Sequence, residues 1–206
     1  MAITGPLAAT LLAALLTLPA CESEPEKDES PETAETAEAE AEKPAEPAGP
    51  LPIVAVGMAG LPSSFVIGDF LFAGQPTPEG LVNARDSGAR LVINTRTEAE
   101  MSFDERSIVQ GLGMRYISLP FTPASLDDVL VETFIFEVKQ HKPEEGKVLL
   151  HCASGGRIAG LWAMYEIKEL KVDPVTAVER ARELSPKLSD EMVVYIGEYA
   201  RRIGAM

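Results

Sequence analysis

Short apolar runs alternate with longer amphipathic stretches from residue 51 to the C-terminus. Compact runs of the strand type lie at 53–58, 65–72, 91–94, 115–119 and 147–151, and Gly68-Asp69 bends the second of them. Helical patterns lie at 78–87, 98–112, 126–140, 157–170, 174–185 and 190–203. Strands that alternate with helices form parallel sheets covered on both faces. The pattern therefore predicts one α/β domain, residues 51–206, with three layers and a mostly parallel central sheet.

The first 20 residues have a different pattern. They carry no charge, and 7–18 is an apolar run as long as the hydrophobic region of a secretory signal. It is shorter than the ~20 residues that span a bilayer. The run ends in Leu18-Pro19-Ala20-Cys21, which resembles the lipobox of bacterial lipoproteins. The resemblance implies a signal peptide at 1–20, a lipid on Cys21, and a place in the cell envelope, on the periplasmic face or at the outer membrane. An ordinary cleaved signal or a single membrane anchor is the alternative.

Residues 22–50 join this signal to the domain. They hold eleven acidic residues against two lysines, with no aromatic residue and no Val, Ile or Leu. Such a segment buries too little apolar surface to offset the entropy of ordering. We therefore predict that 21–50 is an acidic, disordered tether that begins at the lipidated cysteine.

The tether also explains most of the charge. Removing its net charge of −9 from the total of −14 leaves −5 for the rest of the chain. That value is ordinary for a soluble surface and argues against nucleic acid or anionic lipid as a partner. The expected membrane contact is through the N-terminal lipid only.

The segment VLLHCASGGRIAG, residues 148–160, concentrates the candidate chemistry. A buried strand ends in His151 and Cys152, and a turn of small residues leads to a helix that begins near Arg157. Backbone N–H groups at such a helix start form an anion site, where a cysteine thiolate is stabilised and an arginine can hold an oxyanion through two hydrogen bonds. The plain alternative is a buried cysteine before a tight turn, with the arginine in solvent.

Four segments carry a resemblance to a known family. They are FLFAGQPTPEGL (70–81), GARLVINTRTEAE (88–100), GMRYISLPF (113–121) and VLLHCASGGRIAGLWAMYEI (148–167). Together they resemble the cysteine-dependent tyrosine and dual-specificity phosphatases, and more narrowly the bacterial phosphatase-like domains of beta-lactamase hydrolase-like proteins and of fusions to NAD kinase. The resemblance implies a dual-specificity-phosphatase-like fold and hydrolysis of a phosphate monoester through a phosphocysteine.

The same resemblance assigns roles to the loop. It implies that Cys152 is the nucleophile, that Arg157 clamps the phosphate, and that His151 orients the loop. The backbone of Ala153, Ser154, Gly155 and Gly156 would bind the phosphate oxygens. The implied partner is a phosphorylated substrate, and neither a metal nor another cofactor is expected.

Three departures from the wider phosphatase pattern stand out. Four residues separate Cys152 from Arg157 where five are usual, and Ile158 replaces the Ser or Thr that eases departure of the thiolate. The acid that protonates the leaving group would have to be Asp127 or Asp128, later in the chain than usual. Either aspartate could equally be a helix N-cap.

Two other functions stay open. A four-residue loop is also typical of rhodanese sulfurtransferases, in which the cysteine carries a persulfide. The domain could alternatively bind phosphate or another anion with little turnover. Near the loop, Arg96 follows the 91–94 strand and could add a positive contact, although pairing with Glu98 or Glu100 is an equal expectation.

Overall fold

The computed structural model describes residues 49–206. The predicted signal at 1–20, Cys21 and nearly all of the 21–50 tether lie outside the described residues. Within 49–206, no helix is both long enough and apolar enough to cross a membrane.

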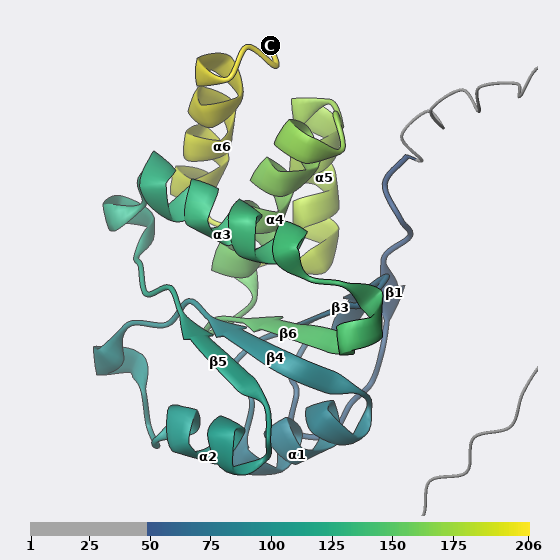
Figure 1. Ribbon diagram of the computed structural model, residues 1–206. Coiled ribbons are helices and arrows are strands. Elements are labelled where there is room, and N and C mark those ends of the chain that lie inside the picture. The colour runs from purple at the N-terminus through teal and green to yellow at the C-terminus, as the bar shows by residue number, and fades with distance from the viewer. Residues whose placement is uncertain (1–48) are drawn as a thin grey trace, which may run out of the picture. The chain divides into compact units, whose positions relative to one another are not determined.

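In the described part of the chain, six strands form one sheet, in the order β1-β2-β3-β6-β4-β5 (Figure 1). Their bounds are β1 Val54–Ala55, β2 Phe65–Ile67, β3 Phe70–Ala73, β4 Ala89–Asn94, β5 Arg115–Ser118 and β6 Lys147–His151. The first three strands pair antiparallel, and β3, β6, β4 and β5 pair in parallel. The predicted mostly parallel central sheet is confirmed, with an antiparallel edge that follows from the bend at Gly68-Asp69.

Within residues 49–206, six α-helices cover the sheet, α1 and α2 on one face and α3 to α6 on the other (Figure 1). Their bounds are α1 Pro78–Asp86, α2 Glu105–Gly111, α3 Asp128–Gln140, α4 Gly156–Glu169, α5 Pro174–Leu184 and α6 Asp190–Arg202. In the same residues three short 3-10 turns lie in connections between strands and helices: η1 Glu98–Glu100, η2 Pro123–Ser125 and η3 Pro143–Glu145. The three-layer α/β architecture is therefore confirmed.

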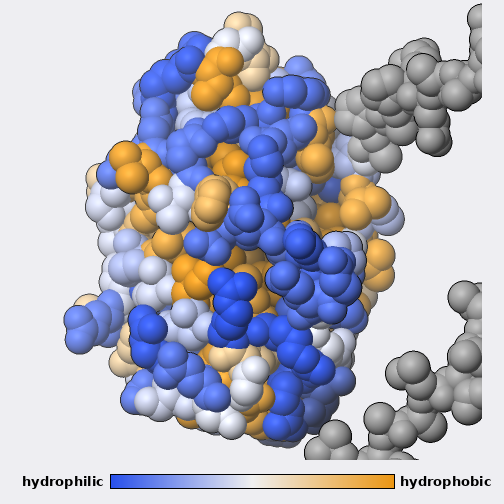
Figure 2. Space-filling view, viewed as in Figure 1, coloured by the Kyte–Doolittle hydropathy of each residue, from blue (hydrophilic) through white to orange (hydrophobic). Residues whose placement is uncertain are grey.

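Each face of the sheet has its own core. The larger core lies under α3 to α6 and includes Cys152, Ile158 and Trp162; the smaller core lies under α1 and α2. Helix α4 is buried along most of its length, so its N-terminus is fixed from several sides. Polar side chains cover most of the face seen in Figure 2, with apolar patches between them.

Local capping explains why α1 begins and ends as the sequence predicts. The hydroxyl of Thr77 accepts a hydrogen bond from the Gly80 amide at 3.0 Å, and Pro78 occupies the first turn. Gly88 follows the helix with a φ of +106°, a conformation that suits glycine.

The prediction of one helix over 98–112 is wrong in its first half. The structure has the single turn η1, an extended connection, and then the short helix α2. The carboxylate of Glu100 reaches back to the amide of Thr97 at 2.8 Å, which closes the turn. Asp104 then caps a new helix by accepting from the Ser107 amide at 3.0 Å. Because the helix is broken here, the Glu100 carboxylate lies at the end of the sheet where β6 ends, within hydrogen-bond distance of Arg157.

Candidate active site

The Cys152 loop, residues 152–156, joins the end of β6 to the start of α4. Gly155 has a φ of +89°, which a residue with a side chain rarely adopts. A Cβ on Gly156 would lie 2.3 Å from the carbonyl oxygen of Lys187. The two glycines are therefore required, one by the turn and one by the close approach of the chain after α5.

Two carbonyl groups of the loop accept hydrogen bonds from the surrounding structure, whereas most of its amides have no acceptor. The Gln75 amide donates to the Ala153 carbonyl at 3.1 Å, and the Ser185 hydroxyl donates to the Ser154 carbonyl at 3.2 Å. The amides of Ala153, Ser154 and Gly156 donate to no other group among the described residues. Free amides at the start of a helix form an anion site. The contact with Gln75 also gives the GQPTPE segment a structural role.

Cys152 lies at the base of this loop and is 1% exposed. The Gly155 amide donates a hydrogen bond to its sulfur at 3.0 Å. This contact fixes the sulfur beneath the free amides of the loop. Cys152 also packs within the larger core, so only a substrate group that enters the loop itself can reach it.

Arg157 is held by an acidic residue that the sequence analysis did not assign to it. Glu100 accepts two hydrogen bonds from the Arg157 guanidinium, at 2.6 Å from Nη2 and at 2.9 Å from Nη1. Nη1 also donates to the carbonyl oxygens of Thr95 and Phe121, at 3.1 and 2.6 Å. Mainly because of the hydrogen bond from Arg157, the pKa of Glu100 is lowered to about 2. Arg157 is therefore not the solvent-facing arginine of the plain alternative.

These contacts leave one edge of the guanidinium open. A guanidinium carries five N–H donors, and Glu100 with the two carbonyls engages Nη1 and one hydrogen of Nη2. The Nε hydrogen and the second Nη2 hydrogen have no hydrogen-bond partner within residues 49–206. Two parallel N–H groups on one edge match the oxygens of a phosphate or sulfate.

A cavity of about 270 Å³ opens beside the loop, and we call it the loop cavity. Its lining residues come from η1, the β5–α3 connection, the Cys152 loop and the start of α6: Glu100, Thr122, Pro123, Ala153, Ser154, Gly156, Arg157, Lys187, Ser189 and Met192. Lys187 adds a second cation that the sequence analysis missed, because only the close packing against Gly156 places it there. The cations outnumber the single carboxylate in this lining.

Within residues 49–206 the His151 side chain makes no hydrogen bond to the Cys152 loop. Its Nε2 lies 2.8 Å from Oε1 of Glu105, and Oε2 of Glu105 lies 3.6 Å from Nη1 of Arg96. The side chains of all three are fully buried. The expected pairing of Arg96 with Glu98 or Glu100 is therefore wrong: Glu105, at the start of α2, is its acidic neighbour. Through Glu105, a buried row of charged and polar groups links the end of β4 to the residue that precedes Cys152.

Asp127 and Asp128 both make structural contacts. Asp127 is the N-cap of α3 and accepts from the Leu130 amide at 2.8 Å. Asp128 forms an ion pair with Arg202 at 2.7 Å and accepts from the Tyr195 hydroxyl at 2.6 Å. The hydrogen bond from Arg202 is the main reason that the pKa of Asp128 is lowered. Neither aspartate lines the loop cavity, and these contacts oppose the predicted role of either as general acid.

The part of the chain that the structure describes contains no cluster of three or more His, Cys, Asp or Glu side chains that could hold a metal ion. The candidate reactive groups around the loop are its free amides, Cys152, Arg157 and Lys187.

Comparison with known proteins agrees with this arrangement. The profile of the family described as "Beta-lactamase hydrolase-like protein, phosphatase-like domain" matches residues 63–168, just over half of the chain. The chain belongs to this phosphatase-like family. The match runs from the β1–β2 connection to the end of α4 and includes the whole Cys152 loop.

Two relatives of the phosphatase-like family are beta-lactamase hydrolase-like proteins of Xylella fastidiosa, from strains Temecula1 and 9a5c. Each is 28% identical over 116 residues, which cover 53% of this chain. The aligned part spans 26% of each relative. The chain therefore matches about a quarter of the length of these relatives.

Solved structures share the fold. A DUF442 protein from Shewanella putrefaciens CN-32 matches with a TM-score of 0.60 and 18% identity, over 70% of this chain and 95% of the other. TpbA from P. aeruginosa matches with a TM-score of 0.58 and 19% identity, over 74% and 92%. PTPMT1 matches with a TM-score of 0.55 and 19% identity, over 67% and 93%. The dual-specificity-phosphatase-like fold is thus confirmed.

Proposed function

We propose that the domain is a cysteine-dependent phosphatase that hydrolyses a phosphate monoester through a phosphocysteine. The observation that carries the proposal is the combination at one helix start of the Cys152 sulfur, free loop amides and the open edge of Arg157. Membership of the phosphatase-like family supports it. Catalysis of phosphoryl transfer consists largely of such positioning and charge stabilisation.

In the first step the Cys152 thiolate attacks phosphorus, so an S–P bond forms and the bond to the leaving oxygen breaks. The loop amides and the Nε/Nη2 edge of Arg157 stabilise the charge on the equatorial oxygens. In the second step water attacks the same phosphorus, the S–P bond breaks, and inorganic phosphate leaves with the thiolate restored. Lys187 strengthens the attraction of the loop cavity for the substrate dianion.

Two features predict slow turnover. Asp127 and Asp128 are engaged in structural contacts, so protonation of the leaving oxygen falls to water. Ile158 lacks the hydroxyl that eases departure of the thiolate. Aryl phosphates, whose leaving groups need little protonation, should therefore be the better substrates. TpbA has been solved in complex with phosphotyrosine, which makes an aryl phosphate ester the first substrate class to test.

The test is pre-steady-state turnover of the full chain with p-nitrophenyl phosphate, quenched in SDS at alkaline pH because an S–P bond hydrolyses readily in mild acid. We expect a burst of nitrophenol and a protein-bound phosphate that survives denaturation at alkaline pH and is lost in mild acid. Cys152→Ser should abolish both, because a hydroxyl here is a far weaker nucleophile. Arg157→Lys should lose most of the rate although it keeps the charge, because a point charge cannot replace the planar fork.

A sulfurtransferase is the second candidate, favoured by the four-residue spacing between Cys152 and Arg157. The same preparations are assayed with thiosulfate and cyanide. Thiocyanate formation that depends on Cys152, with no release of nitrophenol, would overturn the phosphatase proposal in favour of this one. Binding of inorganic phosphate that requires Arg157, without either turnover, would favour an anion-binding module.

We also propose that the domain is exported and anchored to the cell envelope by a lipid on Cys21. The proposal rests on the LPAC sequence and on the acidic composition of 22–50. Mass spectrometry of the mature protein should find an acylated N-terminal Cys21, and Cys21→Ala should release the protein from membranes. A mature N-terminus at any other residue would contradict the anchor.

A further inference from the structure

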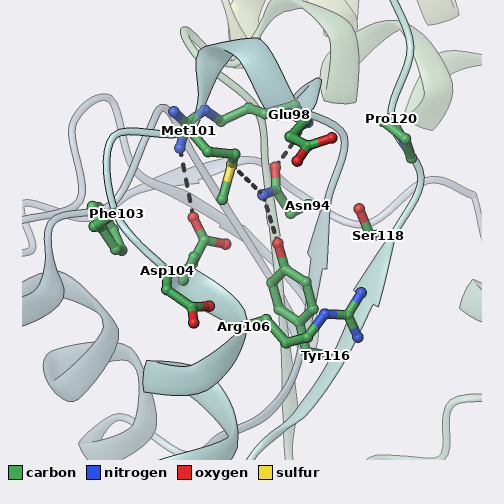
Figure 3. Close-up of a pocket in the computed structure, with 11 residues that line it drawn as sticks. Asn94, Glu98, Met101, Phe103, Asp104, Arg106, Tyr116, Ser118 and Pro120 are labelled. Atoms are coloured by element: carbon green, nitrogen blue, oxygen red, sulfur yellow. Dashed lines mark hydrogen bonds and ion pairs between the residues drawn. The ribbon is translucent and has the colours of Figure 1, made fainter.

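A second cavity, of about 440 Å³, opens beside the carboxyl ends of β4 and β5. We call it the strand-end cavity. It shares no lining residue with the loop cavity. Figure 3 shows Asn94 and Tyr116 side by side in it, below the backbone that carries Glu98 and Met101, with Asp104 and Arg106 on the α2 side. Its volume is typical of a small-molecule site.

Arg96 forms part of its wall and lacks hydrogen-bond partners. The side chain is fully buried, yet Nε, Nη1 and Nη2 donate to no group in residues 49–206. The nearest carboxylate oxygen, Oε2 of Glu105, is 3.6 Å from Nη1, beyond hydrogen-bond distance. Buried guanidinium groups are normally paired, because an unpaired charge in the interior is costly. The lining of the strand-end cavity includes Arg96, and a ligand there can reach this guanidinium once the side chains that cover it move aside.

Other donors face the same space. The Tyr116 hydroxyl accepts a hydrogen bond from Asn94 Nδ2 at 2.8 Å and donates its own hydrogen to no other described residue. Burial is the main reason that the pKa of Tyr116 is raised, so the hydroxyl keeps this hydrogen at neutral pH. The hydroxyl of Ser118, at the end of β5, also lines the cavity. A ligand oxygen would therefore meet a guanidinium and two hydroxyl groups.

The acidic residues limit the charge of the ligand. Glu98, Asp104 and Glu105 line the cavity together with the cations Arg96 and Arg106. Three carboxylates repel a doubly charged phosphate more strongly than a singly charged group. A carboxylate carries one charge and matches the two parallel donors of a guanidinium edge.

We propose that the strand-end cavity binds the carboxylate group of a small, singly charged molecule, with Arg96 as the fork that holds it. The site is separate from the Cys152 loop and does not depend on phosphatase activity. Within the fold it lies at the carboxyl ends of parallel strands, where ligands bind in open α/β sheets.

The test is an NMR titration of the isotope-labelled full chain with sodium acetate, against sodium chloride at the same ionic strength. A ligand of four heavy atoms reaches at best a dissociation constant of about 40 µM, so the titration extends to roughly 100 mM. We expect saturating shifts of the amides at 94–98, 103–106 and 116–118. Absence of saturating shifts there, or shifts confined to the amides of 152–157, would overturn the proposal.

Two variants and one control locate the site. Arg96→Met removes the fork, and Ser118→Glu places a carboxylate of the protein itself in the cavity; both should abolish the acetate shifts. Arg115→Met removes the same charge from β5 at a residue outside the strand-end cavity and should leave them intact. Arg96→Met could unfold the domain, because it leaves Glu105 without its cation. In that case Ser118→Glu decides, since it changes an exposed strand position. Shifts that persist in Ser118→Glu would contradict the proposal.

Discussion

Glu100 and Arg157 face each other across the mouth of the Cys152 loop, joined by two hydrogen bonds of 2.6 and 2.9 Å. The pair fixes the plane of the guanidinium and points its Nε/Nη2 edge away from the carboxylate. A bidentate pair of this kind adds geometric specificity as well as attraction. Glu100 is therefore a positioning residue for Arg157 in the proposed reaction, although it need not touch the substrate.

Glu100→Gln should lower kcat/KM for aryl phosphates by roughly 10- to 100-fold, because small errors in the position of a catalytic group cost that much. It should also weaken competitive inhibition by inorganic phosphate, which binds the same edge. Glu98→Gln removes the same charge on the same turn, at a residue that forms no hydrogen bond or ion pair with Arg157 in the described structure, and should change neither quantity.

A double substitution separates positioning from a purely structural effect. Once Arg157→Lys has removed the fork, Glu100→Gln should cost little more, since residues that act as a pair are not additive. Full additivity of the two losses in rate would show that Glu100 does not act through Arg157.

The same ion pair predicts a contribution to acid stability. The pKa of Glu100 is lowered from 4.5 to about 2 in the folded protein, so the folded state holds its carboxylate charged where the unfolded state would protonate it. The stabilisation is therefore complete above about pH 4.5 and is lost as the pH falls towards 2. Unfolding by denaturant at several pH values should show a shallower loss between pH 4.5 and 2 in Glu100→Gln than in the wild type. Parallel curves would contradict the ion pair.

The sequence predicted most elements because their signals are local. Thr77 and Gly88 bound α1, and the apolar run before Cys152 is β6, Lys147–His151. The failure at 98–112 is also local: Glu98-Ala-Glu100 has a helical composition, but the backbone becomes extended at Met101 and Asp104 caps a new helix. Composition alone does not show that a segment of helix-forming residues divides into a 3-10 turn and a separate short helix.

The site was predicted less completely because its partners are distant in the chain. Cys152, Arg157 and the loop glycines form one contiguous motif, which sequence patterns can identify. Glu100 is 57 residues from Arg157, and Glu105 is 46 residues from His151. Nothing local assigns either acid to its partner, since several glutamates follow β4. Only the parallel alignment of β4 with β6 brings them together.

Asp127 and Asp128 give a prediction that distinguishes caps from catalysts. Asp127→Ala should lower the free energy of unfolding by about 1 kcal/mol, the usual cost of a lost N-cap. Asp128→Asn should weaken the contacts with Arg202 and Tyr195 that attach α3 to α6. Neither change should alter kcat for p-nitrophenyl phosphate, measured well below the unfolding temperature. A fall in kcat that grows as the leaving group becomes poorer would instead restore that aspartate as the general acid.

Ile158 gives the sharpest test of the second chemical step. It lies in the first turn of α4, is 1% exposed, and packs in the same core as Cys152. In the cysteine-dependent phosphatases that this chain resembles, a Ser or Thr at this position eases departure of the thiolate. Ile158→Thr should therefore speed hydrolysis of the phosphocysteine. The steady-state rate should then rise towards the rate of the initial burst, and less protein-bound phosphate should accumulate. The cost is stability, because a hydroxyl replaces apolar volume in the core.

Ile158→Val is the matched control: it removes one methylene at a cost of about 0.5–1.5 kcal/mol and adds no hydroxyl. Faster turnover in both variants would indicate a loosened loop, whereas faster turnover in Ile158→Thr alone would identify the missing hydroxyl as the cause of slow dephosphorylation.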